Sequence, residues 1–166
     1  MKNNLVLISP DIHLLNKVGE QLSTAMGVKT MDMEEYTRYT LSRDDDTVLA
    51  KAGKDYYFDG YEKALYSLAD FEEVLVLADL KICMADNLVQ NINQYMYVVL
   101  LNAPVKQLDS MITQYISTKN KLYKMTKTKI KNNFRTLKSN ADIVVKIGED
   151  NIAEKIIDKM MEKYNG

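Results

Sequence analysis

The chain has 166 residues, of which 46% are hydrophobic and 27% charged, and these values predict one globular domain over residues 1–166. Its net charge of −1 gives no overall field that would select nucleic acid or a membrane surface. A single cysteine, Cys83, excludes an internal disulfide, and the apolar run Leu5–Ile8 is too short for a signal peptide or membrane span, so we expect a cytoplasmic protein with no membrane contact.

Short apolar runs predict parallel strands that alternate with helices. The expected strands are Leu5–Ile8, a weaker one at Lys29–Met33, Val74–Leu77, Tyr97–Leu101 and Ile143–Val145. Apolar residues recur at helical spacing in stripes that begin at Leu14, Tyr57, Leu108 and Ile152, and a further helix is expected after the acids at Asp44. This alternation predicts an α/β fold, a three-layer α/β/α sandwich around a five-stranded parallel sheet.

The turn after the first strand has the composition of a helix start. Ser9 is a favoured N-cap, Pro10 a favoured first helical residue and Asp11 a favoured first-turn acid. We therefore expect a helix to begin near Pro10, with Leu14 facing the core. The only histidine, His13, is expected to be a surface or capping residue rather than a catalyst.

Residues 5–34 resemble, without a gap, the first βαβ unit of the shikimate kinases, which are small P-loop phosphotransferases. Two later segments are also similar to that family: Val98–Pro104 to its V-V-Y-L-D-A-P strand and Ala141–Val145 to its A-D-I-V-V strand. The resemblance covers nearly the whole chain. It implies the P-loop kinase architecture.

The resembled phosphate loop, G-x-x-x-x-G-K-[ST], is altered at each position that binds ligand. Ser9 and Leu14 stand at the two glycines, Leu15 at the lysine and Asn16 at the magnesium-binding hydroxyl. The resemblance therefore implies a degenerate P-loop, with Ser9 and Asn16 as the residues left to contact an anion or nucleotide. No cofactor is expected, and Mg-ATP would be needed only by a divergent kinase.

Acidic residues follow the second strand where the family has D-x-D. The resemblance implies that Asp32 serves the metal and reaction centre and that Glu34 holds substrate hydroxyls. Asp79 and Lys81 follow the third strand, and the carboxyl ends of parallel strands are where α/β sheets bind ligands, so they could face the same crevice. Two alternatives stay open: Asp32 or Glu34 caps the next helix, and Asp79 and Lys81 pair with each other or with solvent.

The positions of the family's two substrate arginines hold other residues. Asp59 stands at the first and Asn133 at the second, while Arg135 lies close to the second but out of register. We keep Arg135 as a candidate substrate-binding residue with Glu34, Asp79 and Lys81.

Residues Lys119–Lys138, called here the basic segment, carry eight basic residues and no acid. In the resembled kinases this region is the mobile lid over the nucleotide, and the alternative is a solvated helix face. Lys124, Lys127 and Lys131 are the candidates for anion or nucleotide binding.

Three functions remain open on the sequence. The first is a non-catalytic binding or regulatory module with an unknown protein or small-molecule ligand. The second is a divergent small-molecule phosphotransferase that uses Asp32 and the basic segment. The third is a polyanion-binding protein acting through Lys119–Lys138. No spacing of histidine, cysteine or acids predicts a metal site.

Overall fold

The structure, a computed structural model, describes residues 4–119 and 123–165. Its centre is one five-stranded sheet in the order β2-β3-β1-β4-β5, in which all neighbouring strands are parallel. The strands are β1 (Leu5–Ile8), β2 (Lys29–Asp32), β3 (Val74–Ala78), β4 (Tyr97–Asn102) and β5 (Ile143–Lys146). The predicted parallel sheet is therefore confirmed.

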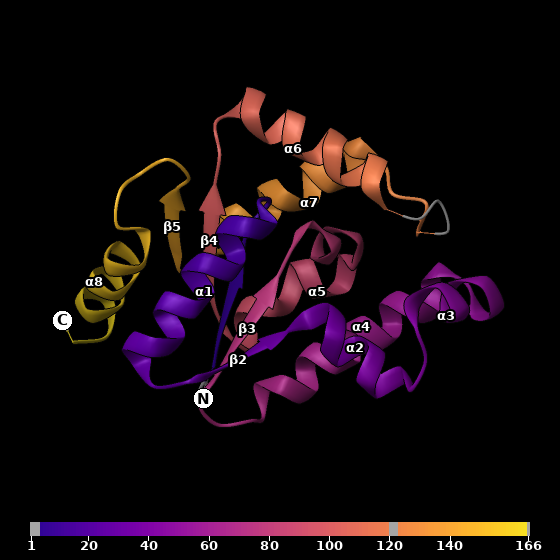
Figure 1. The fold of residues 1–166 in the computed structure, drawn as a ribbon, viewed down its shortest axis with the longest axis horizontal. Coiled ribbons are helices and arrows are strands. Elements are labelled where there is room, and N and C mark those ends of the chain that lie inside the picture. The colour runs from indigo at the N-terminus through magenta and orange to yellow at the C-terminus, as the bar shows by residue number, and fades with distance from the viewer. Residues whose placement is uncertain (1–3, 120–122, 166) are drawn as a thin grey trace.

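Helices cover both faces of this sheet (Figure 1). They are α1 (Ile12–Met26), α2 (Met33–Leu41), α3 (Asp45–Ala52), α4 (Lys54–Ala69), α5 (Asp86–Asn91), α6 (Val105–Thr118), α7 (Lys127–Asn140) and α8 (Ile152–Asn165), with short 3-10 helices η1 (Leu80–Met84) and η2 (Ile92–Gln94). None of the helices within the described ranges is long and apolar enough to span a membrane.

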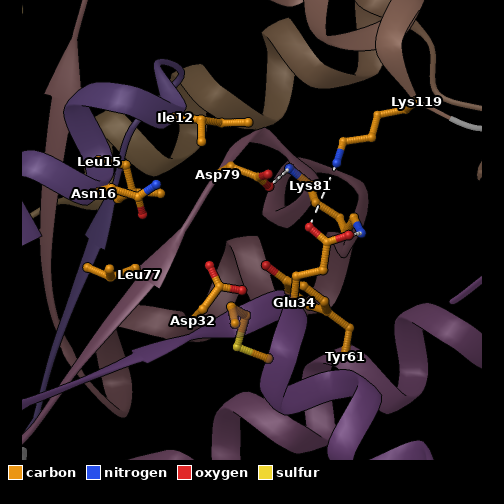
Figure 2. Close-up of a pocket in the computed structure, with 11 residues that line it drawn as sticks. Ile12, Leu15, Asn16, Asp32, Glu34, Tyr61, Leu77, Asp79, Lys81 and Lys119 are labelled. Atoms are coloured by element: carbon orange, nitrogen blue, oxygen red, sulfur yellow. Dashed lines mark hydrogen bonds and ion pairs between the residues drawn. The ribbon is translucent and has the colours of Figure 1, made fainter. Parts of the chain in front are cut away.

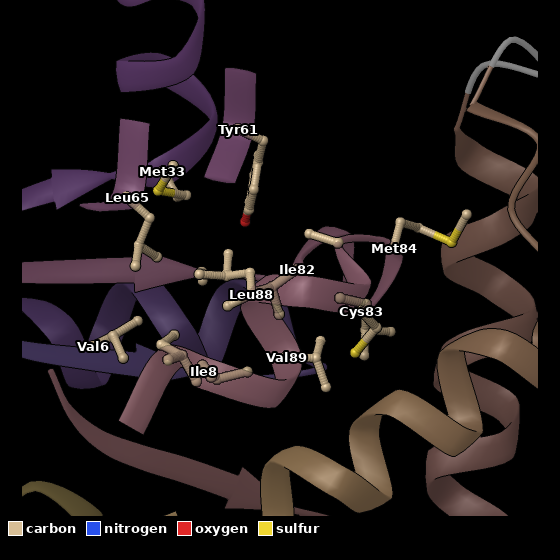
Figure 3. Packing of buried hydrophobic residues seen from close by; sticks show 14 of the residues in the cluster. Val6, Ile8, Met33, Tyr61, Leu65, Ile82, Cys83, Met84, Leu88 and Val89 are labelled. Atoms are coloured by element: carbon tan, nitrogen blue, oxygen red, sulfur yellow. The ribbon is translucent and has the colours of Figure 1, made fainter. Parts of the chain in front are cut away.

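Side-chain alternation along β1 divides the interior into two cores. Leu5 and Leu7 point to the face covered by α1 and α8, and Val6 and Ile8 point to the opposite face. Figure 3 shows part of this second core, in which Ile8 packs in one cluster with Leu65 of α4. Because both of their faces are covered, β1, β3 and β4 are continuous apolar runs that the sequence reveals, whereas the edge strand β2 is partly exposed and gives a weaker pattern.

The basic segment is divided between two structural parts. Lys119 ends α6, residues 120–122 lie outside the described residues, and the second part is α7. The apolar face of α7 is buried through Ile130, Phe134 and Leu137, and the helix packs against η1, α5 and α6. These contacts agree with the alternative of a helix with one solvated face, and mobility of the segment as a lid stays a prediction.

Replacing Phe134 with alanine should lower the free energy of unfolding by about 3–5 kcal/mol, because it deletes a large side chain that is 2% exposed and leaves a cavity. Arg135→Ala, at the exposed neighbouring position, is the matched control and should change it by no more than about 0.5 kcal/mol. Urea unfolding measures both values. Equally small losses would show that α7 is not packed in solution.

Candidate functional site

A small cavity lies beyond the carboxyl ends of β2 and β3, beside the first turns of α1 and α2 (Figure 2). Its volume is about 100 Å³. Its lining brings together five predicted site residues: Asn16, Asp32, Glu34, Asp79 and Lys81. The prediction that the residues after β2 and β3 would face one crevice therefore agrees with the geometry, although the roles assigned to them stay predictions.

The turn between β1 and α1 differs from the predicted helix start. The helix begins at Ile12, and its N-cap is Asp11, whose Oδ1 accepts from the backbone N–H of Leu14 at 3.1 Å. Ser9 was predicted as the cap, but its backbone N–H donates to the carbonyl of Ala78 and its Oγ bonds the backbone of Asp11. Because Ser9 extends the sheet edge, the helix can start only after it.

The acids after β2 belong to the start of α2. Asp32 is the N-cap, with Oδ1 accepting from the backbone N–H of Glu35 at 3.0 Å. The alternative that Asp32 caps the next helix is thus confirmed. Glu34 lies in the first turn of α2, two residues past the end of β2, where its carboxylate faces Lys81 from η1.

Lys81 is the centre of a buried polar network. The residue is 0% exposed, and its Nζ donates to Glu34 Oε1 at 2.8 Å, to Tyr123 OH at 3.0 Å and to Tyr57 OH at 3.2 Å. These bonds use all three ammonium hydrogens. The same Nζ lies 3.6 Å from Asp45 Oδ2 and 4.4 Å from the centroid of the Tyr123 ring. Lys81 pairs across the site with Glu34, and its only bond to Asp79 is from its backbone N–H.

The network shifts the two acids that share Lys81 in opposite directions. Burial by itself would raise the pKa of Glu34, but attraction and hydrogen bonding to Lys81, with help from Lys119, lower it to about 2. Burial raises the pKa of Asp45, the charge of Lys81 offsets this only in part, and the neighbouring Glu34 raises it further. Asp45 Oδ1 is buried with no hydrogen-bond partner among the described residues. Glu34 is therefore the ionised partner of Lys81.

Asp79 caps η1 at the end of β3. Its Oδ1 accepts from the backbone N–H of Lys81 and from Tyr115 OH, both at 2.9 Å. Burial raises the pKa of Asp79, and the bond from Lys81 with the charges of Lys119 and Lys81 offsets this rise in part. The carboxyl group thus lines the cavity while being anchored on one oxygen.

The other predicted site residues lie outside this cavity. Ser9 is buried in the turn, Lys124 is exposed, and Lys127 and Lys131 pair with Asp109 of α6 at 2.6 and 3.1 Å. Arg135 is exposed on α7 and absent from the lining. The structure therefore does not bring Arg135 together with Glu34, Asp79 and Lys81.

Several residues of the site were missed by sequence reasoning. The helical spacing predicts Tyr61 only as a member of the apolar stripe that begins at Tyr57, and Lys119 only as part of the basic segment, yet both line the cavity. Lys81 was a candidate, but its burial was not foreseen. A signal was present, since Lys81 is the one charged residue in the apolar run Leu80–Met84.

The cavity does not have the geometry of a metal centre. Among the parts of the chain that the structure describes, no three side chains of histidine, cysteine, aspartate or glutamate are arranged to hold a metal ion. The lining instead combines carboxylates with the ammonium groups of Lys81 and Lys119. It offers hydrogen bonds and charge rather than coordination.

Neither the family models nor the curated proteins compared with this sequence give a match. The fold is similar to the crystal structure of shikimate kinase from Aquifex aeolicus, with a TM-score of 0.74 and 18% identity over 98% of this chain and 99% of that chain. For shikimate kinase from Acinetobacter baumannii in complex with shikimate, the TM-score is 0.73 and the sequence identity 13%, over 98% of this chain and 95% of that chain. For a gluconokinase from Sinorhizobium meliloti, the TM-score is 0.53 and the sequence identity 13%, over 99% of this chain and 94% of that chain. The protein has a shikimate kinase-like P-loop kinase fold, and at these identities the likeness establishes the fold alone.

Replacing Lys81 with methionine should lower the free energy of unfolding by about 3–5 kcal/mol, because the acids that it pairs with would stay buried without their cation. Lys63→Met is the control, since Lys63 pairs with Asp59 on the open surface, and it should leave stability unchanged. Chemical denaturation of both variants tests the difference. A Lys81→Met variant as stable as the native chain would contradict a supporting role for the network.

The low pKa of Glu34 predicts the sign of a pH effect on stability. Because the pKa is lower in the folded than in the unfolded chain, ionised Glu34 stabilises the fold above pH 4.5, and this contribution is lost as pH falls toward 2. Glu34→Gln should therefore flatten the fall in unfolding free energy over that interval. Glu35→Gln, at the exposed neighbouring position, should keep the native slope, and an unchanged slope in Glu34→Gln would refute the assignment.

Proposed function

We propose that this protein is a non-catalytic binding or regulatory module of the cytoplasm that has retained the kinase scaffold. The observation that carries the proposal is the Asp11 carboxylate at the N-terminus of α1, bonded to the backbone N–H of Leu14. P-loop proteins bind phosphate with such N–H groups at the start of this helix. Here the chain's own carboxylate takes that place.

The surroundings of Asp11 support a degenerate P-loop. Pro10 has no N–H to donate, and the negative charge of Asp11 would repel an incoming phosphate. Leu15, at the position that resembles the P-loop lysine, is 2% exposed and packs in the apolar core. Asn16 supplies an amide where the family has a hydroxyl for magnesium. No cofactor is therefore expected.

The substrate side of the scaffold is also filled by side chains of this chain. Lys81 and its three partners occupy the space between η1, α2 and α4. The cavity beside Asp32 and Asp79 has a volume of about 100 Å³, well below the roughly 300–1,000 Å³ of pockets for drug-sized ligands, and a more open hollow of about 390 Å³ adjoins it at Glu34 and Lys119. A ligand bound in the cavity beside Asp32 would be small, or would present only one small group to it.

The two positions that resemble substrate arginines have contacts of their own. Asp59 pairs with Lys63 on the surface at 2.9 Å. The amide of Asn133 donates to the carbonyl of Cys83 and to Asp86. Neither side chain offers the paired N–H donors with which arginine binds a carboxylate, so shikimate is not the expected ligand.

A second candidate is a divergent small-molecule phosphotransferase that uses Asp32 and Mg-ATP. It is favoured by the gathering of Asp32, Glu34 and Asp79 with Lys81 and Lys119 at one sheet edge. Polyanion binding through Lys124, Lys127 and Lys131 has less support, because Lys127 and Lys131 already pair with one acid, Asp109.

Calorimetry with Mg-ATP should detect no micromolar binding to the native chain, because the lysine and hydroxyl that hold ATP phosphates and magnesium are absent. A coupled assay should likewise show no phosphorylation of shikimate. The informative variant is Asp32→Asn. Asparagine also caps helices, so this substitution removes the negative charge and keeps the cap of α2.

Micromolar ATP binding that Asp32→Asn abolishes would overturn the non-catalytic reading and establish the phosphotransferase. Turnover that exceeds that of Asp32→Asn would do the same. Absence of both supports the module.

A further inference from the structure

A tyrosine hydroxyl group without a protein partner faces the cavity. Tyr61 is 1% exposed and lines the cavity, and its side chain reaches it beside Asp32 (Figure 2). Among the described residues its OH has no hydrogen-bond partner, whereas the buried hydroxyls of Tyr57, Tyr115 and Tyr123 are all bonded. Because the Tyr61 side chain is almost fully enclosed and its hydroxyl group faces the cavity without a protein partner, that hydroxyl group is available to a bound ligand atom.

Carboxylates surround that hydroxyl group. Asp32 and Asp79 each use one oxygen in a helix cap, which leaves their second oxygens without a protein donor. Burial raises the pKa of Tyr61, and the charges of Asp79, Glu34 and Asp32 raise it further, so the phenol stays neutral among negative groups. Glu34 is already neutralised by Lys81. Asp32 and Asp79 are therefore the lining acids that form no ion pair among the described residues.

The chain places one cation of its own at the edge of this space. Lys119, at the end of α6, lies with Nζ 3.7 Å from Glu34 Oε2 and 4.9 Å from the centroid of the Tyr115 ring. Neither contact is a short hydrogen bond. Lys119 thus adds positive charge at the edge of the cavity but donates no hydrogen bond to Asp32, Asp79 or Tyr61.

We propose that the cavity binds a small organic cation, a primary ammonium group, with its N–H donors directed to Asp32 and Asp79 and with Tyr61 as a neutral partner. The proposal rests on the proposed function, since it treats the cavity as a binding site. An ammonium suits the site because it carries several donors on one small centre, and a volume of about 100 Å³ admits such a group. The carboxylates would repel an anion, and the described residues do not form a metal site.

The probe is methylammonium chloride, titrated into the isotopically labelled native chain and followed by NMR at constant ionic strength. The expected result is a saturable change confined to residues around the cavity. Tetramethylammonium chloride is the matched control, because it has the same charge but no N–H donor and should give no such change.

Variants test each partner separately. Asp32→Asn, which keeps a capping side chain, and Asp79→Asn should each weaken methylammonium binding at least tenfold, because a hydrogen bond to a charged group is lost. Tyr61→Phe should weaken it less, and Lys119→Gln should strengthen it by removing the competing cation. Glu72→Gln, at an exposed position outside the lining, should leave it unchanged.

The proposal is overturned if methylammonium gives no saturable change, if tetramethylammonium gives the same change, or if folded Asp32→Asn and Tyr61→Phe both bind as the native chain does. Such a result together with absent ATP binding would refute only the ammonium ligand, and the proposal of a non-catalytic module would remain. Micromolar ATP binding would refute the non-catalytic module, whatever the outcome with methylammonium.

Discussion

The arrangement of the site depends on the burial of one ammonium group. Lys81 has no exposed surface, so its charge must be balanced and hydrogen-bonded from within the protein. Its partners come from three places: Glu34 from α2, Tyr57 from α4, and Tyr123 from the connection between α6 and α7. A single side chain of η1 therefore links these elements beside the sheet edge.

Helix capping by acids is the second constraint, and it acts on the same edge. Asp11, Asp32 and Asp44 cap α1, α2 and α3, and each accepts a backbone N–H that would otherwise be free. A capped N-terminus is a stable helix start, but it is a poor phosphate site because the anion position is already taken by a carboxylate. In this chain the cap of α1 thus supports the proposed degenerate phosphate loop.

The scaffold and the site consequently lead to different conclusions. The sheet, its helices and the likeness to solved kinases establish a kinase fold, whereas the cavity at its carboxyl edge is small, acidic and partly filled. A fold fixes where a ligand would meet the protein, and the side chains there decide which ligand it is. The proposal that this edge binds a ligand rests on Tyr61, whose enclosed side chain lines the cavity without a hydrogen-bond partner among the described residues.

The sequence by itself determined the parallel sheet and the start of α3, because apolar runs and acidic caps are local patterns. It also placed Asp32 and Asp79 at one edge, since consecutive parallel strands end there. The choice of Asp11 over Ser9 as the cap depended on the bond from Ser9 to Ala78, which only the folded sheet supplies. The Lys81 network was likewise decided by tertiary structure, because its partners lie 24 to 47 residues away along the chain and no local pattern relates them.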